Sequence, residues 1–245
     1  MLSFKLFGIP VGVHVTFLFI ALLGATSYRG WDIAIWTLAA FLSILAHEMG
    51  HALVARGFDA SGVKVTLYGL GGVTTFSRTR AMEPWKSFIV SASGSAVGIA
   101  LGGTVWFAAR AGLFDGSGPG VTVFINSLFF TSLVWGVLNW IPIVPLDGGH
   151  MVQYFIAIFS ESKAPLISQV ITWIAVVIIV PYAWLNGYQF GAIIVVMFAF
   201  AGLREYRQRA AAAKPRQMQP PQPSQPKPAP PADPTPGEPP PEFPI

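Results

Sequence analysis

The segment His47-Glu48-Met49-Gly50-His51 holds two histidines four residues apart, with a glutamate directly after the first. In an α-helix this spacing puts both imidazoles on one face, one turn apart, where they can bind the same zinc ion. The glutamate is then adjacent to the metal and can take a proton from an attacking water. We therefore predict that His47 and His51 are zinc ligands and that Glu48 is a general base.

A catalytic zinc usually has three protein ligands and an open position for water, so this motif lacks one ligand. The chain has no cysteine, which leaves histidine and carboxylate side chains as candidates. Of the eleven acidic residues, Glu48 and Asp147 alone lie within apolar segments, and the others fall in loops, at segment ends or in the tail. Taken alone, Asp147 could cap a helix N-terminus. Together with the two histidines, it is predicted to be the third ligand of one zinc ion per chain.

Three further polar residues accompany these motifs. Asn139 lies beside a break containing two prolines, where its amide could hydrogen-bond a substrate peptide or stabilise a developing oxyanion. His14 lies in an apolar segment and is expected to be a core histidine. His150 follows Asp147 after two glycines and is expected to pack near the site without binding the metal.

The composition indicates a membrane protein. Hydrophobic residues make up 53% of the 245 residues, charged residues make up 11%, and the mean hydropathy is +0.58. Soluble proteins contain about 25% charged residues. The formal net charge of +4 is small, and its placement suggests membrane orientation and not nucleic-acid binding.

Six apolar segments are candidate membrane spans, so the predicted fold class is an all-α polytopic membrane protein with about six transmembrane helices. They cover residues 11–27, 33–55, 85–109, 121–160, 166–185 and 188–203. The fourth is too long for one straight crossing, and it contains Pro142 and Pro145, which interrupt a helix. Irregular backbone at membrane depth requires surrounding protein or water, so a functional site is expected there.

The basic residues predict the orientation. When the six segments are threaded back and forth from a cytoplasmic N-terminus, thirteen of the fifteen Lys and Arg residues fall on the cytoplasmic side. Arg29 and Arg110 fall on the other side. This distribution follows the positive-inside rule. It predicts a multi-pass protein of the plasma (inner) membrane with both termini in the cytoplasm.

A short membrane-associated β-hairpin is predicted between the second and third segments. Residues 63–68 alternate apolar and polar positions, residues 69–72 are mostly glycine, and residues 73–76 resume a strand-like pattern. After Leu203 the sequence becomes basic and then rich in proline, which is typical of disordered chain. The predicted division is a transmembrane domain over residues 1–203 and a cytoplasmic tail over 204–245. Whether the tail binds a proline-recognising partner is left open.

Two motifs resemble those of the site-2 protease family of intramembrane zinc metalloproteases: HEMGH at positions 47–51 and NWIPIVPLDGGH at positions 139–150. Weaker similarity lies in LFGIPVGVH at positions 6–14 and GLGGV at positions 69–73. The likeness extends over about residues 1–203. The chain departs from many relatives in showing no inserted PDZ-like region and no CBS-type pair, which puts regulation through such modules in doubt.

The resemblance implies a six-helix core around a zinc site, together with a strand that can pair with an unwound substrate. The residues it assigns are the ligands His47, His51 and Asp147, the general base Glu48, Asn139 for substrate or transition-state binding, and Gly71 and Gly72 of the substrate-pairing hairpin.

The combined expectation is an endopeptidase that cleaves transmembrane or juxtamembrane segments of membrane-anchored regulatory proteins, a process called regulated intramembrane proteolysis. Its partners would be such a protein substrate and the lipid bilayer. Whether the chain forms a homo-oligomer is left open. A catalytically silent scaffold that binds transmembrane clients is the main alternative, and the presence of Glu48 argues against it. A zinc transporter is a weaker alternative, because no chain of polar residues crosses the apolar segments.

Overall fold

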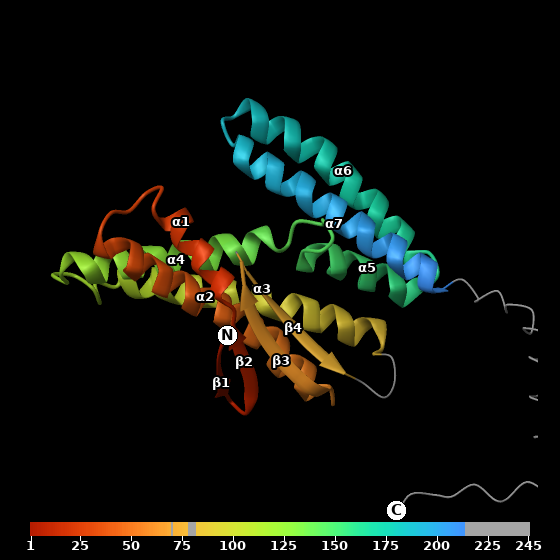
Figure 1. Cartoon of the computed structure of the whole chain (residues 1–245), viewed down its shortest axis with the longest axis horizontal. Coiled ribbons are helices and arrows are strands. Elements are labelled where there is room, and N and C mark those ends of the chain that lie inside the picture. Colours follow the sequence, from red (N-terminus) through yellow and green to blue (C-terminus); the bar gives the residue numbers. More distant parts are fainter. Residues whose placement is uncertain (70, 78–81, 214–245) are drawn as a thin grey trace, which may run out of the picture.

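The computed structural model describes residues 1–69, 71–77 and 82–213 (Figure 1). Its helices are α1 (Ile20–Gly24), α2 (Trp31–Gly57), α3 (Pro84–Arg110), α4 (Pro119–Leu138), α5 (Asp147–Phe159), α6 (Ala164–Leu185) and α7 (Gln189–Ala213). Its strands are β1 (Leu2–Leu6), β2 (Ile9–Val13), β3 (Ser61–Tyr68) and β4 (Gly71–Ser77). The predicted disordered, proline-rich tail lies outside the described residues from 214 onward.

Five helices have the length and apolar composition needed to cross a membrane, namely α2, α3, α4, α6 and α7. They coincide with five of the six predicted segments. The long fourth segment breaks between α4 and α5, as its two prolines predicted. The protein is therefore a mostly helical membrane protein, as expected.

The first predicted span, residues 11–27, is wrong as a continuous helix. Residues Ile9–Val13 form β2, and a short apolar helical segment, Val15–Gly24, follows it. The reason is tertiary pairing: β2 lies between β1 and β3, which buries Ile9 and Val11, and hydropathy averaged along the chain does not reveal such pairing. The predicted count of six spans is not confirmed, since the described residues contain five helices of spanning length.

The predicted hairpin is present as part of a four-stranded sheet with the order β1-β2-β3-β4. Strand β2 pairs parallel to β3, and β3 pairs antiparallel to β4. The predicted four-residue turn is wrong, because Tyr68 pairs with Gly71 and Leu67 pairs with Gly72. Gly69 takes a φ of +52°, a conformation that glycine adopts without strain, so the chain reverses at once and β4 begins at Gly71.

The sheet packs against the C-terminal half of α2 (Figure 1). Ile9, Val11, Val65 and Leu67 are at most 2% exposed and share one core cluster with Ala52 of α2. Each such side chain removed from water contributes about 1.5–3 kcal/mol. This packing brings β4, an edge strand, next to the helical turn that carries the HEMGH motif.

Helices α2, α3 and α4 pack closely through glycines. A Cβ atom added at Gly50 of α2 would lie 3.0 Å from the Cα of Gly94 in α3, and one added at Gly98 would lie 3.1 Å from the carbonyl oxygen of Ser132 in α4. Small residues spaced four apart let transmembrane helices approach this closely. The contact fixes the depth of the HEMGH turn relative to α3.

Residues 139–146, between α4 and α5, run as turns and bends. Ile143 is 0% exposed, and the Val144 amide donates a hydrogen bond to the Thr172 hydroxyl at 3.2 Å. Protein thus encloses this irregular backbone, which is the condition for its presence at membrane depth. The segment directs the chain into α5.

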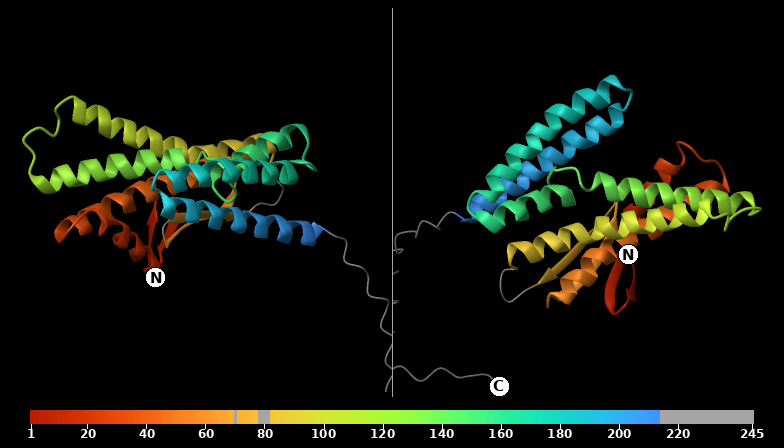
Figure 2. Two further views of the ribbon diagram at one scale, coloured as in Figure 1. Left: turned by 90° about the horizontal axis from the view of Figure 1, so that it is seen from above. Right: turned by 180° about the vertical axis from the view of Figure 1, so that it is seen from behind.

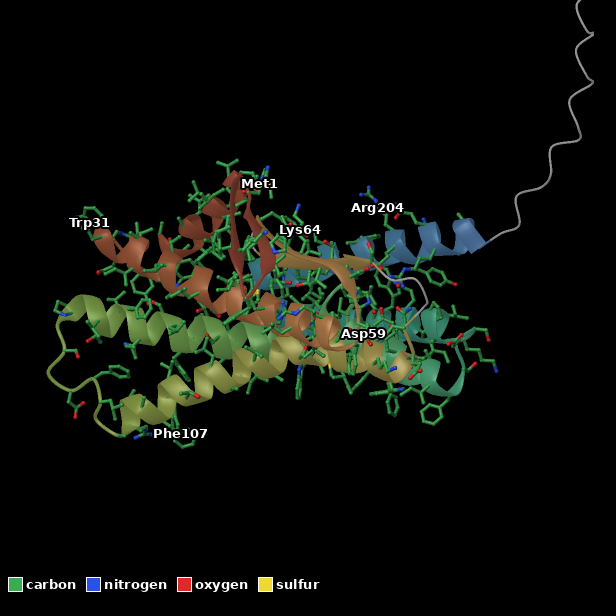
Figure 3. All side chains as sticks on the ribbon, turned by 90° about the horizontal axis from the view of Figure 1, so that it is seen from below. Met1, Trp31, Asp59, Lys64, Phe107 and Arg204 are labelled. Carbon is green, nitrogen blue, oxygen red and sulfur yellow. The ribbon has the colours of Figure 1, made fainter. Side chains whose placement is uncertain are left out.

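The chain has two distinct ends along the helix axes. Trp31 and Phe107 lie at one end, while Asp59 and Arg204 lie toward the other (Figure 3). Helices α6 and α7 form a hairpin that leans away from α2 and α4 (Figures 1 and 2). Helix α7 continues to Ala213, so the basic residues directly after Leu203 are helical and the predicted boundary at residue 204 is not the end of the helix.

Candidate metal centre

Helix α2 places the HEMGH motif in the interior of the molecule. His47, Glu48 and His51 are 5%, 6% and 7% exposed. Buried histidine and glutamate side chains are costly in apolar surroundings unless they have partners or bind a metal. Their burial on a helix of spanning length therefore indicates a functional site.

Asp147, the first residue of α5, meets the two histidines. Its Oδ2 lies 3.0 Å from Nε2 of His47 and 3.2 Å from Nε2 of His51. The two Nε2 atoms are 3.2 Å apart. The structure thus brings together the three side chains predicted to be ligands, from two helices far apart in sequence.

These three atoms fit a zinc ion. At normal bond lengths, two ligands of a tetrahedral zinc lie about 3.3 Å apart. The three measured separations of 3.0, 3.2 and 3.2 Å match that value. Two imidazoles and one carboxylate also make a typical ligand set for catalytic zinc, which keeps a fourth position open.

Groups around the ligands hold them in place. Nδ1 of His51 lies 2.7 Å from the carbonyl oxygen of Val90, which fixes the proton on Nδ1 and leaves the Nε2 lone pair for the metal. The Ser95 hydroxyl donates to Oδ2 of Asp147 at 3.3 Å. A Cβ atom added at Gly94 would lie 2.2 Å from Nε2 of His51, so only glycine leaves room for this ring.

The two glycines after Asp147 position α5. A Cβ atom added at Gly148 would lie 2.3 Å from the carbonyl oxygen of Trp140, and one added at Gly149 would lie 2.4 Å from the Val144 nitrogen. The Gly148 amide also donates to the carbonyl oxygen of Asn139 at 2.5 Å. The first turn of α5 therefore rests directly on the irregular segment. The alternative role of Asp147 as an N-cap is wrong, because Leu146 occupies the N-cap position.

Glu48 points toward strand β4 and is not part of the ligand group. The Thr74 hydroxyl lies 2.7 Å from Oε2 of Glu48 and 3.0 Å from its carbonyl oxygen. A Cβ atom added at Gly72 would lie 2.5 Å from Cγ of Glu48. A hydroxyl donor on one oxygen orients the carboxylate, and the glycine lets the strand come close to it.

The remaining predicted site residues, Gly71, Gly72 and Asn139, do not all lie at the metal centre. Gly72 lines a cavity beside Glu48, whereas Gly71 and Asn139 are not among the residues that line this cavity. Asn139 ends α4, and its carbonyl contact with Gly148 helps to position Asp147.

A cavity of about 250 Å³ opens beside the ligands. One side is formed by β4, through Gly72, Thr74 and Phe76. Helix α3 contributes Ser87, Val90 and Ser91 to the lining, and α5 contributes Asp147, His150 and Tyr154. The site is thus a groove lined by a strand and by helices.

The sequence did not assign Thr74, Ser95 or Gly94 to the metal site. The four-residue spacing of Gly94, Gly98 and Gly102 on an apolar helix could have indicated a close helix contact. Thr74 lies two residues after Gly72 on a strand, so the two share a face, but their contact with α2 is tertiary.

Comparisons with known proteins agree with this geometry. Residues 115–182, which include Asp147, match peptidase family M50. The chain is 30% identical over 196 residues to a protein of Synechocystis sp. described as a zinc metalloprotease, an alignment that covers 71% of this chain and 50% of that protein. It is 36% identical over 116 residues to zinc metalloprotease Rip3 of Mycobacterium tuberculosis, covering 46% of this chain and 29% of Rip3.

The chain thus spans about half or less of the length of these relatives. Its fold resembles the site-2 protease from Methanocaldococcus jannaschii, with a TM-score of 0.58, 24% identity, and coverage of 84% of this chain and 96% of that chain. Matches to sequence, fold and ligand set therefore converge, and the chain belongs to peptidase family M50, the site-2 protease family of zinc metalloproteases.

Proposed function

We propose that the chain is an intramembrane zinc endopeptidase that cleaves transmembrane or juxtamembrane segments of membrane-anchored regulatory proteins. The observation that carries this proposal is the buried Glu48 carboxylate beside the converging ligand atoms of His47, His51 and Asp147. A scaffold that only binds clients needs no carboxylate oriented at such a site. The placement of this group on a helix of spanning length supports hydrolysis at membrane depth.

His47, His51 and Asp147 would hold the metal, which when bound polarises the scissile carbonyl and activates the attacking water. Glu48 takes a proton from that water and later returns it to the amide nitrogen as the carbon–nitrogen bond breaks. Thr74 donates to Oε2 of Glu48, which leaves Oε1 for the proton. Packing of α3 on the His51 ring excludes bulk water from one side of the site.

Strand β4 supports a mode of substrate binding. In the described part of the chain, β3 is the strand that pairs with β4, and no described strand pairs with the other edge of β4. Because Tyr68 pairs with Gly71 at the end of the β3–β4 ladder, the alternate residues Gly72 and Thr74 are expected to direct their amides and carbonyls to that outer edge. A transmembrane substrate that unwinds next to Glu48 could regain its lost backbone hydrogen bonds there.

The orientation predicted from the basic residues also bears on the side of the membrane to which the site opens. Asp59, which follows the C-terminus of α2, and Arg204 lie toward one end (Figure 3). Trp31 and Phe107, which neighbour Arg29 and Arg110 in the sequence, lie at the other end. We infer that the zinc site opens toward the cytoplasmic half of the plasma (inner) membrane. The substrate-binding role of Asn139 stays a prediction, and a homo-oligomer and a partner for the tail stay open.

Zinc binding can be tested with a variant that leaves all three ligands in place. Gly94→Ala puts a methyl group into the His51 ring position, so zinc affinity should fall by about 10- to 100-fold. Asp147→Ala, which removes a predicted ligand, serves as the reference for loss of zinc. Gly103→Ala serves as the control, because a Cβ atom at Gly103 meets nothing within 4 Å. Zinc is measured by mass spectrometry of purified protein, and full retention in Asp147→Ala would contradict the ligand assignment.

Glu48→Gln separates catalysis from binding. The amide cannot accept the proton of the water, so cleavage should fall by about 10²- to 10⁴-fold. Zinc content and co-purification with a single-pass substrate should not change, because Glu48 is not a ligand. The measurement is the appearance of the cleaved fragment on coexpression with candidate substrates. Cleavage at the wild-type rate in this variant would contradict the assignment of Glu48 as the general base.

Two substitutions at one position test pairing with β4. Thr74→Val removes the hydroxyl that contacts Glu48 and should slow cleavage of a helical membrane substrate and of a short extended peptide alike. Thr74→Pro also removes the amide donor, and should lower cleavage of the helical substrate by about a further tenfold. If proline is no worse than valine on the helical substrate, or equally worse on both substrates, strand pairing at this edge is not part of the mechanism.

Cysteine labelling tests the orientation, since the natural chain contains no cysteine. Ser117→Cys, in the α3–α4 loop, should react with an impermeant maleimide added to intact cells. Ala210→Cys, near the end of α7, should react only after the cells are opened. The reverse pattern would place the zinc site toward the outer face of the membrane.

A further inference from the structure

Helix α5 presents three polar side chains to the cavity. Asp147, His150 and Tyr154 are spaced three and four residues apart, so they lie on one face of the helix, and all three line the cavity. Asp147 belongs to the ligand group, whereas His150 and Tyr154 do not. The mechanism described above uses neither of them.

His150 has unused hydrogen-bonding capacity, and its ring stacks on that of Tyr154. Within the described residues, Nδ1 of His150 is buried and has no partner. The His150 and Tyr154 rings stack, with centroids 6.2 Å apart and an interplanar angle of 24°. A buried polar group without a partner costs free energy, and such groups call for an explanation such as a catalytic role. Stacking holds both rings on the cavity side of α5.

The opposite side of the groove suggests what these two side chains bind. An extended peptide directs successive carbonyls to opposite edges. A substrate segment paired with β4 would therefore turn every second carbonyl away from β4. Helix α5 contributes side chains to the same cavity as β4, so we expect those carbonyls to face α5.

We propose that His150 and Tyr154 are substrate-contacting donors on the α5 side of the groove, a proposal that rests on the proposed function. The His150 ring N–H hydrogen-bonds the oxyanion that forms when water adds to the scissile carbonyl and the carbonyl electron pair moves to oxygen. The Tyr154 hydroxyl hydrogen-bonds a substrate carbonyl farther along the groove.

Neither group gives up its proton in this sequence. Glu48 carries the transferred proton from the water to the leaving amine. When the carbonyl re-forms and the carbon–nitrogen bond breaks, the oxyanion disappears and the His150 hydrogen bond weakens. His150 therefore stabilises the transition state more than the bound substrate, whereas Tyr154 stabilises both.

The test uses three variants of the full chain. His150→Ala removes the donor, His150→Gln retains an N–H donor of similar reach, and Tyr154→Phe removes one hydroxyl while keeping the ring. Tyr182→Phe is the matched control, because Tyr182 is exposed on α6 and does not line this cavity. The readouts are kcat and KM on an extended peptide, zinc content, and the affinity of a phosphinic peptide that imitates the tetrahedral intermediate.

His150→Ala should lower kcat by about 100-fold and weaken phosphinic peptide binding by a similar factor, at unchanged zinc content. His150→Gln should recover part of both losses. Tyr154→Phe should raise KM by about tenfold with little change in kcat, and Tyr182→Phe should match the wild type.

Loss of zinc from His150→Ala, or wild-type kcat and phosphinic peptide affinity in that variant, would overturn the proposal. Failure of the proposed function is distinguishable, because it would appear as zinc-loaded wild-type protein that cleaves no peptide. Phosphinic peptide affinity would still report on His150 in that case.

Discussion

The contact between α2 and α3 at Gly50 and Gly94 is the constraint on which the site depends. Zinc ligands in an apolar helix are tolerable only if each polar atom has a partner. The absence of a side chain at Gly94 leaves the space that the His51 ring fills, and the same approach brings the Val90 carbonyl to Nδ1 of that ring. One close helix packing thus both buries the histidine and selects its tautomer.

The position of Asp147, the predicted third ligand, depends on a second constraint, the irregular backbone before α5. A continuous helix through residues 139–146 would leave no short path by which Asp147 could begin a new helix beside α2. The break ends α4 and starts α5 at the depth of the histidines, and Gly148 and Gly149 let the new helix lie on the broken segment. The backbone groups freed by this break find partners within the protein, as the Val144 amide does on Thr172.

The parts of this arrangement that could be predicted from the sequence are those in which chemistry is local. The spacing of His47 and His51 on a helix, and the two prolines that break the long apolar segment, each act within a few residues. The parts that could not be predicted depend on pairing between distant segments. Residues 9–13 are as apolar as a span, but they form a strand because β3 is available as a partner. The contact of Thr74 with Glu48 likewise joins positions that share no local pattern.

The groove is lined by elements of different chemistry, and in the proposed binding mode this bears on specificity. Strand β4 would pair with the backbone of the substrate, which is the same for every sequence. The α5 side chains would meet carbonyl oxygens, which are also common to all peptides. Recognition of this kind discriminates poorly between side chains. Discrimination must then come from the cost of unwinding a substrate helix far enough to reach Glu48, so that segments with glycine, proline or polar residues near the cleavage point are favoured over uniformly helical ones.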